Sequence, residues 1–215
     1  MSVELVVVVA GGEAPHREAL PAIPAGTPVV AADSGLEHAR ELGLEVTLAV
    51  GDFDSASPEV VATAEASGTP IERHPAEKDA TDLELALDAA LKLRPQRVVL
   101  LAGIGDRLDH LFSAFLLLAS PRYAGVEVDA HIGLARVHVV RGERTLSGLP
   151  GELVSLFALH GRAEGVRTEG LAYPLDGETL EPGSSRGVSN VFASARGTIA
   201  VERGVLIAIR PGRKR

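Results

Sequence analysis

The chain has 215 residues, of which 46% are hydrophobic and 23% charged, and it carries a formal net charge of −8 and no cysteine. This balance is typical of a globular protein, and no apolar run approaches the roughly 20 residues that span a membrane, so we expect no membrane contact. The acidic charge argues against a nucleic-acid partner, and the absence of cysteine excludes disulfides and thiolate metal sites.

The first 120 residues alternate between β-branched runs and helical patterns. The β-branched runs predict strands at residues 5–10, 28–32, 48–50, 71–74 and 98–102. The helical periods between them predict helices at residues 17–20, 36–42, 59–67, 82–93 and 108–119. This alternation is typical of an α/β domain with a parallel sheet.

After Ser120-Pro121 the helical signal disappears. Short strands are predicted between Gly-rich turns at residues 126–132, 136–140, 153–159, 198–201 and 205–209. We therefore expect a second, all-β domain, with residues 1–130 in the first domain and 131–215 in the second. The segment 126–132 could instead close the first sheet.

The two ends of the chain carry little functional signal. The N-terminus has no basic leader, and its apolar run leads into Gly11-Gly12 like a buried strand, so no export signal is visible. Together with the absence of cysteine, this favours a cytoplasmic location. The basic end at residues 213–215 is interpreted as a solvated tail.

Residues 51–55 read Gly-Asp-Phe-Asp-Ser and follow a predicted buried strand. Ligands of parallel α/β sheets bind at the carboxyl ends of strands. Asp52 and Asp54 are two apart and point the same way, and two converging carboxylates repel unless a proton or a cation intervenes, so a hard divalent cation is the natural partner. The alternative is that Asp54 and Ser55 cap the helix that starts after Pro58.

A second acidic motif opens the predicted helix at residues 82–93. Thr81 with Glu84 three residues later forms a capping box, and Asp82 suits the positive end of the helix dipole. Asp79 has no such structural explanation. It is therefore a candidate functional carboxylate.

A third motif, Gly-Ile-Gly-Asp-Arg-Leu-Asp-His, follows the predicted strand at residues 98–102. It begins like a dinucleotide fingerprint, but Leu108 occupies the third glycine position, which argues against a Rossmann NAD site. A glycine turn before a helix can still receive phosphate on backbone N–H groups, with Arg107 adding a fixed charge. Asp109 and His110 could equally be ordinary polar residues of a first helical turn.

In their order along the chain, these motifs resemble the thiamine pyrophosphokinase family. The resemblance rests on residues 31–35, 51–55, 79–87, 105–110, 170–175 and 187–190. It implies a Rossmann-like parallel α/β catalytic domain followed by a thiamine-binding β-sandwich, and a homodimer with active sites at the interface. The implied reaction is Mg²⁺-dependent transfer of pyrophosphate from ATP to thiamine, giving thiamine diphosphate and AMP.

The resemblance also suggests roles for individual residues. The carboxylates expected in the metal and triphosphate region are Asp52, Asp54, Asp79 and Asp82, of which Asp54 and Asp79 are expected to bind the ion directly. The residues expected on the nucleotide side are Asp33, Asp52, Ser55, Gly103, Gly105, Arg107, Asp109 and His110. Ser189 and Asn190 are expected to hydrogen-bond the thiamine pyrimidine.

Three departures from the family pattern are visible. Ser34 and Asp106 stand where the family commonly has glycine, and the chain has no tryptophan to stack on thiamine, so Phe192 or an aliphatic wall would replace it. Two alternatives remain open. One is an aspartate-nucleophile phosphatase with Asp52 as the nucleophile, and the other is a non-catalytic thiamine or nucleotide sensor.

Overall fold

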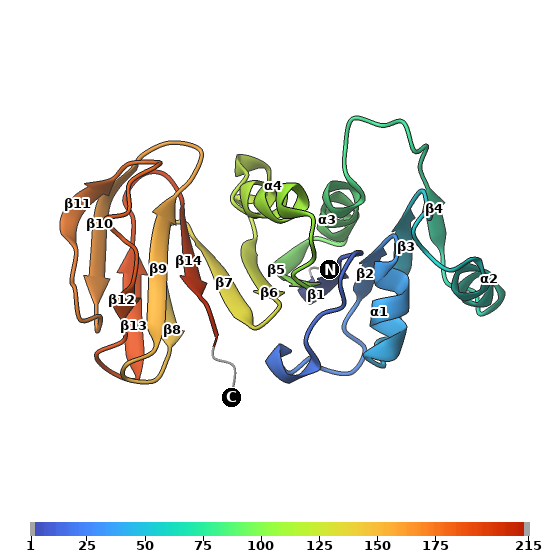
Figure 1. The fold of residues 1–215 in the computed structure, drawn as a ribbon, viewed down its shortest axis with the longest axis horizontal. Coiled ribbons are helices and arrows are strands. Elements are labelled where there is room, and N and C mark those ends of the chain that lie inside the picture. The colour runs from blue at the N-terminus through green and yellow to red at the C-terminus, as the bar shows by residue number, and fades with distance from the viewer. Residues whose placement is uncertain (1–2, 213–215) are drawn as a thin grey trace. The chain divides into compact units, whose positions relative to one another are not determined.

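The computed structural model describes residues 3–212, which form two compact units (Figure 1). The first unit runs to residue 111 and includes residues 126–133, and the second contains residues 112–125 and continues from residue 134. Residues 112–125, which precede the expected boundary near residue 130, thus group with the second unit. The basic tail at residues 213–215 lies outside the described residues.

The first unit is built on a parallel sheet in the order β6-β5-β1-β2-β3-β4. Its strands are β1 (Val3–Val9), β2 (Val29–Ala32), β3 (Leu48–Gly51), β4 (Ile71–Arg73), β5 (Pro95–Ala102) and β6 (Glu127–Ile132). Since β6 pairs with β5 in parallel, the segment predicted at residues 126–132 belongs to this sheet. The side chains of Val6 to Val9 are all buried, as expected of a parallel strand covered on both faces.

The predicted helices are present with one exception. They are α1 (Gly35–Glu41), α2 (Pro58–Ala66), α3 (Asp82–Lys92) and α4 (Leu108–Leu118). The helix predicted at residues 17–20 is wrong, because only a single 3₁₀ turn, η1 (Arg17–Ala19), forms there. Leu20 precedes Pro21 and adopts an extended conformation, which is what the proline ring imposes on the residue before it.

Helix packing fixes the edge at which the loops gather. Helix α1 packs through Ala39 on Val7, Val9 and Val29, and the buried alanines of α3 allow that helix to approach β2 and β3 closely. Because the strands are parallel, the loops that follow β1, β2, β3 and β5 emerge at the same edge of the sheet (Figure 1). All three acidic or Gly-rich motifs of the first unit lie in these loops or at the helix starts beside them.

The second unit contains two sets of antiparallel strands. One has the order β7-β14-β9-β12 and consists of β7 (Ala135–Val140), β14 (Leu206–Arg210), β9 (Leu153–Ala158) and β12 (Asn190–Val191). The other has the order β11-β10-β13-β8 and consists of β11 (Asp176–Leu180), β10 (Ala163–Glu169), β13 (Arg196–Ala200) and β8 (Glu143–Ser147). One hydrophobic cluster, which includes Leu156, Ile199 and Leu206, draws on both sets.

Four of these strands, β8, β10, β11 and β12, were not predicted from the sequence. Strand β12 has only two residues, and the other three carry charged side chains on their exposed faces.

Within residues 3–212, no helix combines the length and apolar character that a membrane crossing requires.

Candidate active site

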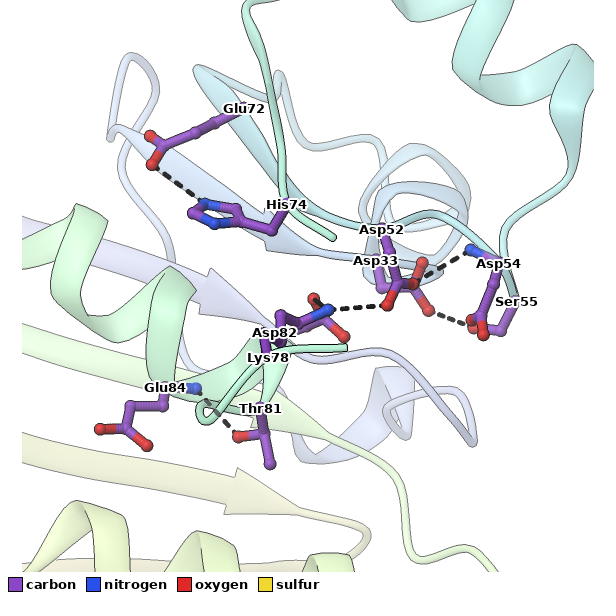
Figure 2. A network of polar contacts seen from close by, with 10 residues as sticks. All are labelled: Asp33, Asp52, Asp54, Ser55, Glu72, His74, Lys78, Thr81, Asp82 and Glu84. Atoms are coloured by element: carbon purple, nitrogen blue, oxygen red, sulfur yellow. Dashed lines mark hydrogen bonds and ion pairs between the residues drawn. The ribbon is translucent and has the colours of Figure 1, made fainter. Parts of the chain in front are cut away.

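Two neighbouring loops bring three aspartates together at the carboxyl edge of the parallel sheet. Asp33 follows β2, and Asp52 and Asp54 follow β3, which pairs with β2. Each aspartate offers one carboxylate oxygen, and these oxygens all lie within 4.8 Å of one another. Figure 2 shows the three side chains converging from the two loops.

The backbone between Asp52 and Asp54 is held in an unusual conformation. Phe53 has a positive φ of 60°, which is rare for a bulky side chain, and its ring is buried in the apolar cluster around α2. The Arg73 guanidinium lies 5.2 Å from the centre of that ring. The backbone N–H of Asp54 donates to Asp52 Oδ1 at 3.2 Å. Burial of Phe53 therefore anchors a turn that directs both carboxylates towards the site.

Asp33 is the most buried of the three carboxylates. It is 8% exposed, its Oδ2 accepts a hydrogen bond from the Ser55 hydroxyl, and its Oδ1 is buried without a hydrogen-bond partner among residues 3–212. Burial raises the pKa of Asp33, an effect that hydrogen bonds from Ser55 and Ser34 partly offset and that the charges of Asp82 and Asp52 reinforce. A buried oxygen without a partner, beside two other carboxylates, suits a hard cation.

We expect Asp33→Asn to raise the melting temperature of the metal-free protein by about 2 to 4 °C at neutral pH, which corresponds to about 1 kcal/mol in a chain of this size. The pKa of Asp33 is raised in the folded state, so the free energy of unfolding decreases as pH rises through that pKa. An asparagine at this position stays neutral, and this decrease does not occur. The gain should disappear at acidic pH. Thermal unfolding with EDTA at several pH values measures it, with Asp176→Asn, a substitution of a fully exposed aspartate in the second unit, as the control. A lower melting temperature for Asp33→Asn at neutral pH would contradict this prediction, because it would mean that neighbouring groups stabilise the Asp33 charge in the folded protein.

The interpretation of Asp54 and Ser55 as helix caps is wrong. The N-cap residue of α2 is Ser57, no side chain caps the helix there, and the Ser57 N–H donates to the Glu37 carboxylate. The Ser55 hydroxyl donates to Asp33 instead and lies 3.2 Å from Ser34 Oγ. The Gly-Asp-Phe-Asp-Ser motif thus contributes to the acidic cluster rather than to the helix.

A lysine that the sequence analysis did not select links the cluster to α3. Lys78 Nζ lies 2.7 Å from Asp52 Oδ2 and 3.0 Å from Asp82 Oδ1 (Figure 2). The hydrogen bond from Lys78 lowers the pKa of Asp52. Thr81 caps α3 as predicted, since its Oγ1 accepts from the Glu84 N–H at 3.3 Å. The sequence signal that could have identified Lys78 is its place within residues 77–84, which contain four acidic residues, in a chain with only three lysines.

The acidic group in the structure differs in membership from the set expected from the sequence. Asp33, expected on the nucleotide side, joins Asp52 and Asp54 in the group of converging carboxylates. Asp82 is connected to this group through Lys78, and Asp79 is an exposed residue outside the group of three.

Glycine is required where the loops after β1 and β5 meet. The Gly103 N–H donates to the Glu13 carbonyl at 3.0 Å, and a Cβ on Gly103 would collide with that carbonyl. The Gly12 N–H donates to Ser34 Oγ at 3.2 Å. Ser34, one of the departures from the family pattern, therefore ties the loop after β1 to the acidic cluster. Gly105 is exposed and lies farther from Glu13.

The side chain of Arg107 is held by its neighbours at the start of α4. Its Nε and Nη2 donate to Asp109 Oδ1 and Oδ2 at 2.9 and 2.7 Å, and Nη2 lies 2.8 Å from His110 Nε2. This pairing lowers the pKa of Asp109 well below its usual range. All three side chains are exposed, so the guanidinium is oriented in advance and accessible to solvent.

In the second unit, the Asn190 amide fixes the backbone around Tyr173. Asn190 Oδ1 accepts from the N–H groups of Tyr173 at 3.0 Å and Val191 at 2.8 Å, and its Nδ2 donates to the Tyr173 carbonyl at 2.6 Å. Asn190 is buried, whereas the neighbouring Ser189 is exposed and has a φ of 59°. The Ser-Asn pair thus combines a structural amide with an accessible hydroxyl residue.

Phe192 cannot replace a thiamine-stacking tryptophan. Its side chain is 1% exposed and packs in the core of the second unit. The Arg210 guanidinium lies over the ring, with its central carbon 5.3 Å from the ring centre. Tyr173, which the sequence analysis did not select, is 59% exposed. Its position within the Gly-Leu-Ala-Tyr-Pro-Leu motif was the signal that could have identified it.

Two protein-family models match these regions. The model for the thiamin pyrophosphokinase catalytic domain matches residues 25–129, and the model for the thiamin pyrophosphokinase vitamin B1 binding domain matches residues 136–206. The first range contains the acidic cluster and Arg107, and the second contains Tyr173 and Asn190. The chain belongs to the thiamine pyrophosphokinase family. This membership confirms the family and the enzyme class predicted from the motifs.

Individual relatives agree with the family models. Thiamine pyrophosphokinase of Bacillus subtilis (strain 168) is 29% identical over 191 residues, which make up 84% of this chain and 86% of the relative. A crystal structure of thiamin pyrophosphokinase from Geobacillus thermodenitrificans is 29% identical, with a TM-score of 0.76 and 98% coverage of both chains. A crystal structure of the Bacillus subtilis protein, 24% identical, has a TM-score of 0.83, covers 98% of this chain and 100% of that chain, and supports the fold. The phosphatase and sensor alternatives are not favoured.

Proposed function

We propose that this chain transfers the pyrophosphoryl group of ATP to thiamine, releasing AMP and thiamine diphosphate. The observation that carries the proposal is the convergence of Asp33, Asp52 and Asp54 at the carboxyl edge of the parallel sheet, within the range that matches the catalytic family model. The transferred group carries several negative oxygens, and carboxylates can stabilise it only through a bound cation.

The residues present fit Mg²⁺. Within the part of the chain that the structure describes, Asp33 has a buried oxygen without a hydrogen-bond partner. Two further carboxylates offer oxygens within 4.8 Å, which is a donor set that hard cations prefer. Asp33, Asp52 and Asp54 would hold the ion, and Asp79 and Asp82 would lie near the triphosphate. When bound, Mg²⁺ supplies positive charge to the phosphate oxygens. Ser55 keeps the Asp33 carboxylate oriented.

The phosphate groups would be received at the start of α4. Arg107 presents a guanidinium that Asp109 and His110 hold in place, so little side-chain freedom is lost when an anion binds. The Gly103 and Gly105 turn and the exposed N–H groups of the first helical turn add donors and a favourable dipole. In the proposed reaction the thiamine hydroxyl oxygen attacks the β-phosphorus in line, the bond between the β-phosphorus and the AMP oxygen breaks, and the hydroxyl proton is released.

Thiamine would bind to the second unit. Ser189 offers an exposed hydroxyl, and among the contacts of the described residues Asn190 Nδ2 uses one of its two hydrogens, which leaves a donor for the aminopyrimidine edge. Tyr173, whose backbone Asn190 fixes, would stack on the ligand. In this proposal the Rossmann-like domain expected at residues 1–130 binds Mg²⁺ and ATP, and the β-sandwich expected at residues 131–215 binds thiamine.

We further propose a cytoplasmic homodimer without nucleic-acid or membrane partners, on the basis of the family resemblance and the net charge of −8. Light scattering at assay concentration should give about twice the chain mass of 22.4 kDa. A monomeric mass together with full activity would contradict the dimer.

The test of the proposed function is an assay of the purified protein with thiamine, ATP and Mg²⁺. AMP and thiamine diphosphate should form in equal amounts, and EDTA should abolish both. A phosphatase would release inorganic phosphate without thiamine, and a sensor would bind thiamine without forming AMP. Either of these outcomes would overturn the proposal.

A further inference from the structure

Lys78 occupies a position that a surface lysine rarely takes. Its side chain is 14% exposed, and its Nζ lies between Asp52 Oδ2 at 2.7 Å and Asp82 Oδ1 at 3.0 Å (Figure 2). Lys92, in contrast, is 68% exposed and lies 3.7 Å from Glu72. Lys78 is thus a half-buried ammonium group with two short carboxylate contacts.

Charge balance explains why a cation is needed at this point. Four carboxylates lie close together here. Those of Asp33, Asp52 and Asp54 converge, and Lys78 pairs with both Asp52 and Asp82. Like charges at such distances repel strongly where water is partly excluded. Lys78 neutralises part of this charge in the absence of any bound ion.

The same contacts place Lys78 in competition with a divalent ion. Asp52 belongs to the three carboxylates that could hold the ion, yet one of its oxygens accepts from Lys78 and the other from the Asp54 N–H. An ion that binds Asp52 must therefore share it with an ammonium group, and two like-charged cations at one carboxylate weaken each other's binding.

We propose that Lys78 is the internal counter-ion of the acidic site and makes binding of the divalent ion dependent on the triphosphate. In this proposal, which rests on the proposed function, the ion alone binds weakly because Lys78 already neutralises Asp52 and Asp82. An arriving triphosphate supplies negative charge for both cations, so the ion and the nucleotide bind together. Lys78 is then a specificity-determining residue that favours the metal–nucleotide complex over the free ion.

The experiment measures the affinity of Mn²⁺ alone, by the electron paramagnetic resonance signal of the free ion, without nucleotide or thiamine. We expect Lys78→Met to bind Mn²⁺ about 10-fold or more tightly than the unchanged protein, because one positive charge beside the ion is removed. Lys78→Arg, which keeps the charge, should stay within about 3-fold, and Lys92→Met should not change the affinity. With ATP added, Lys78→Met should lose most of the cooperativity between Mn²⁺ and ATP that the unchanged protein shows.

Unchanged Mn²⁺ affinity in Lys78→Met, with intact circular dichroism, would overturn the proposal. If Lys78→Met does not fold, Lys78→Gln is measured in its place, since the amide can still donate to one carboxylate. The proposal and the proposed function fail separately. Mn²⁺ titrations need no turnover, so absence of AMP formation would refute the function and leave the counter-ion result readable.

Discussion

Asp54→Asn should lower the turnover number for pyrophosphoryl transfer by about 100-fold or more, while the protein remains folded. Asp54 is exposed, and its backbone N–H donates to Asp52 Oδ1, a hydrogen bond that asparagine at this position retains. The substitution therefore keeps the shape of the turn and removes one of the three converging charges. If these charges hold the ion that neutralises the transferred group, the loss appears in the transition state.

Steady-state kinetics with Mg²⁺ titrated from micromolar to millimolar concentration measures this effect. Asp176→Asn is the matched control, because Asp176 is a fully exposed aspartate of the second unit and its loss should leave the turnover number unchanged. Near-normal turnover and metal dependence in Asp54→Asn would remove Asp54 from the metal site.

Asn190→Ala should weaken thiamine binding by about 5- to 150-fold and leave ATP affinity nearly constant. The amide holds three backbone groups of Tyr173 and Val191, and losing such a partner in a desolvated position costs about 1 to 3 kcal/mol. The Tyr173 ring would then lose its fixed orientation, in addition to any direct contact between Asn190 and thiamine. The expected nucleotide site lies in the other unit, so ATP binding should not respond.

Calorimetric titrations with thiamine and with ATP, each measured separately, test this division between the units. Asn190→Asp is the companion variant, since Oδ1 can still accept from the Tyr173 and Val191 N–H groups while the donor to the Tyr173 carbonyl is lost and a buried charge faces that carbonyl. Thiamine binding that stays unchanged in Asn190→Ala while ATP binding collapses would contradict the assignment of thiamine to the second unit.

The parallel strands were predictable because a strand that is buried on both faces has a continuous run of apolar residues. The run Val6 to Val9 is apolar at every position, and such a run has few alternatives to a central strand. Strands β8, β10 and β11 lack this signal, because their exposed faces are charged and pairing across the sheet, rather than local sequence, determines them. The 3₁₀ turn at Arg17–Ala19 was missed because Pro21 outweighed a short helical period.

The acidic site was only partly predictable for a related reason. The spacing of Asp52 and Asp54 indicated convergence, which is a local property of an extended segment. The participation of Asp33 depends on β2 lying beside β3, and the Lys78–Asp52 pair joins residues 26 positions apart. No local pattern reports such contacts. The hydrogen bond between Asn190 and Tyr173 likewise depends on tertiary structure. The sequence therefore identified the Ser-Asn pair but not the contact of Asn190 with the Tyr173 backbone.

The proposed reaction moves one pyrophosphoryl group intact from ATP to thiamine. Its most direct test uses two preparations of ATP, radiolabelled at the β- or the γ-phosphorus, in separate reactions with thiamine and Mg²⁺. Both labels should appear in thiamine diphosphate in equal yield, and unlabelled AMP should be released in the same amount. Transfer of the γ-label alone, with release of ADP, or retention of label on the protein, would contradict the account.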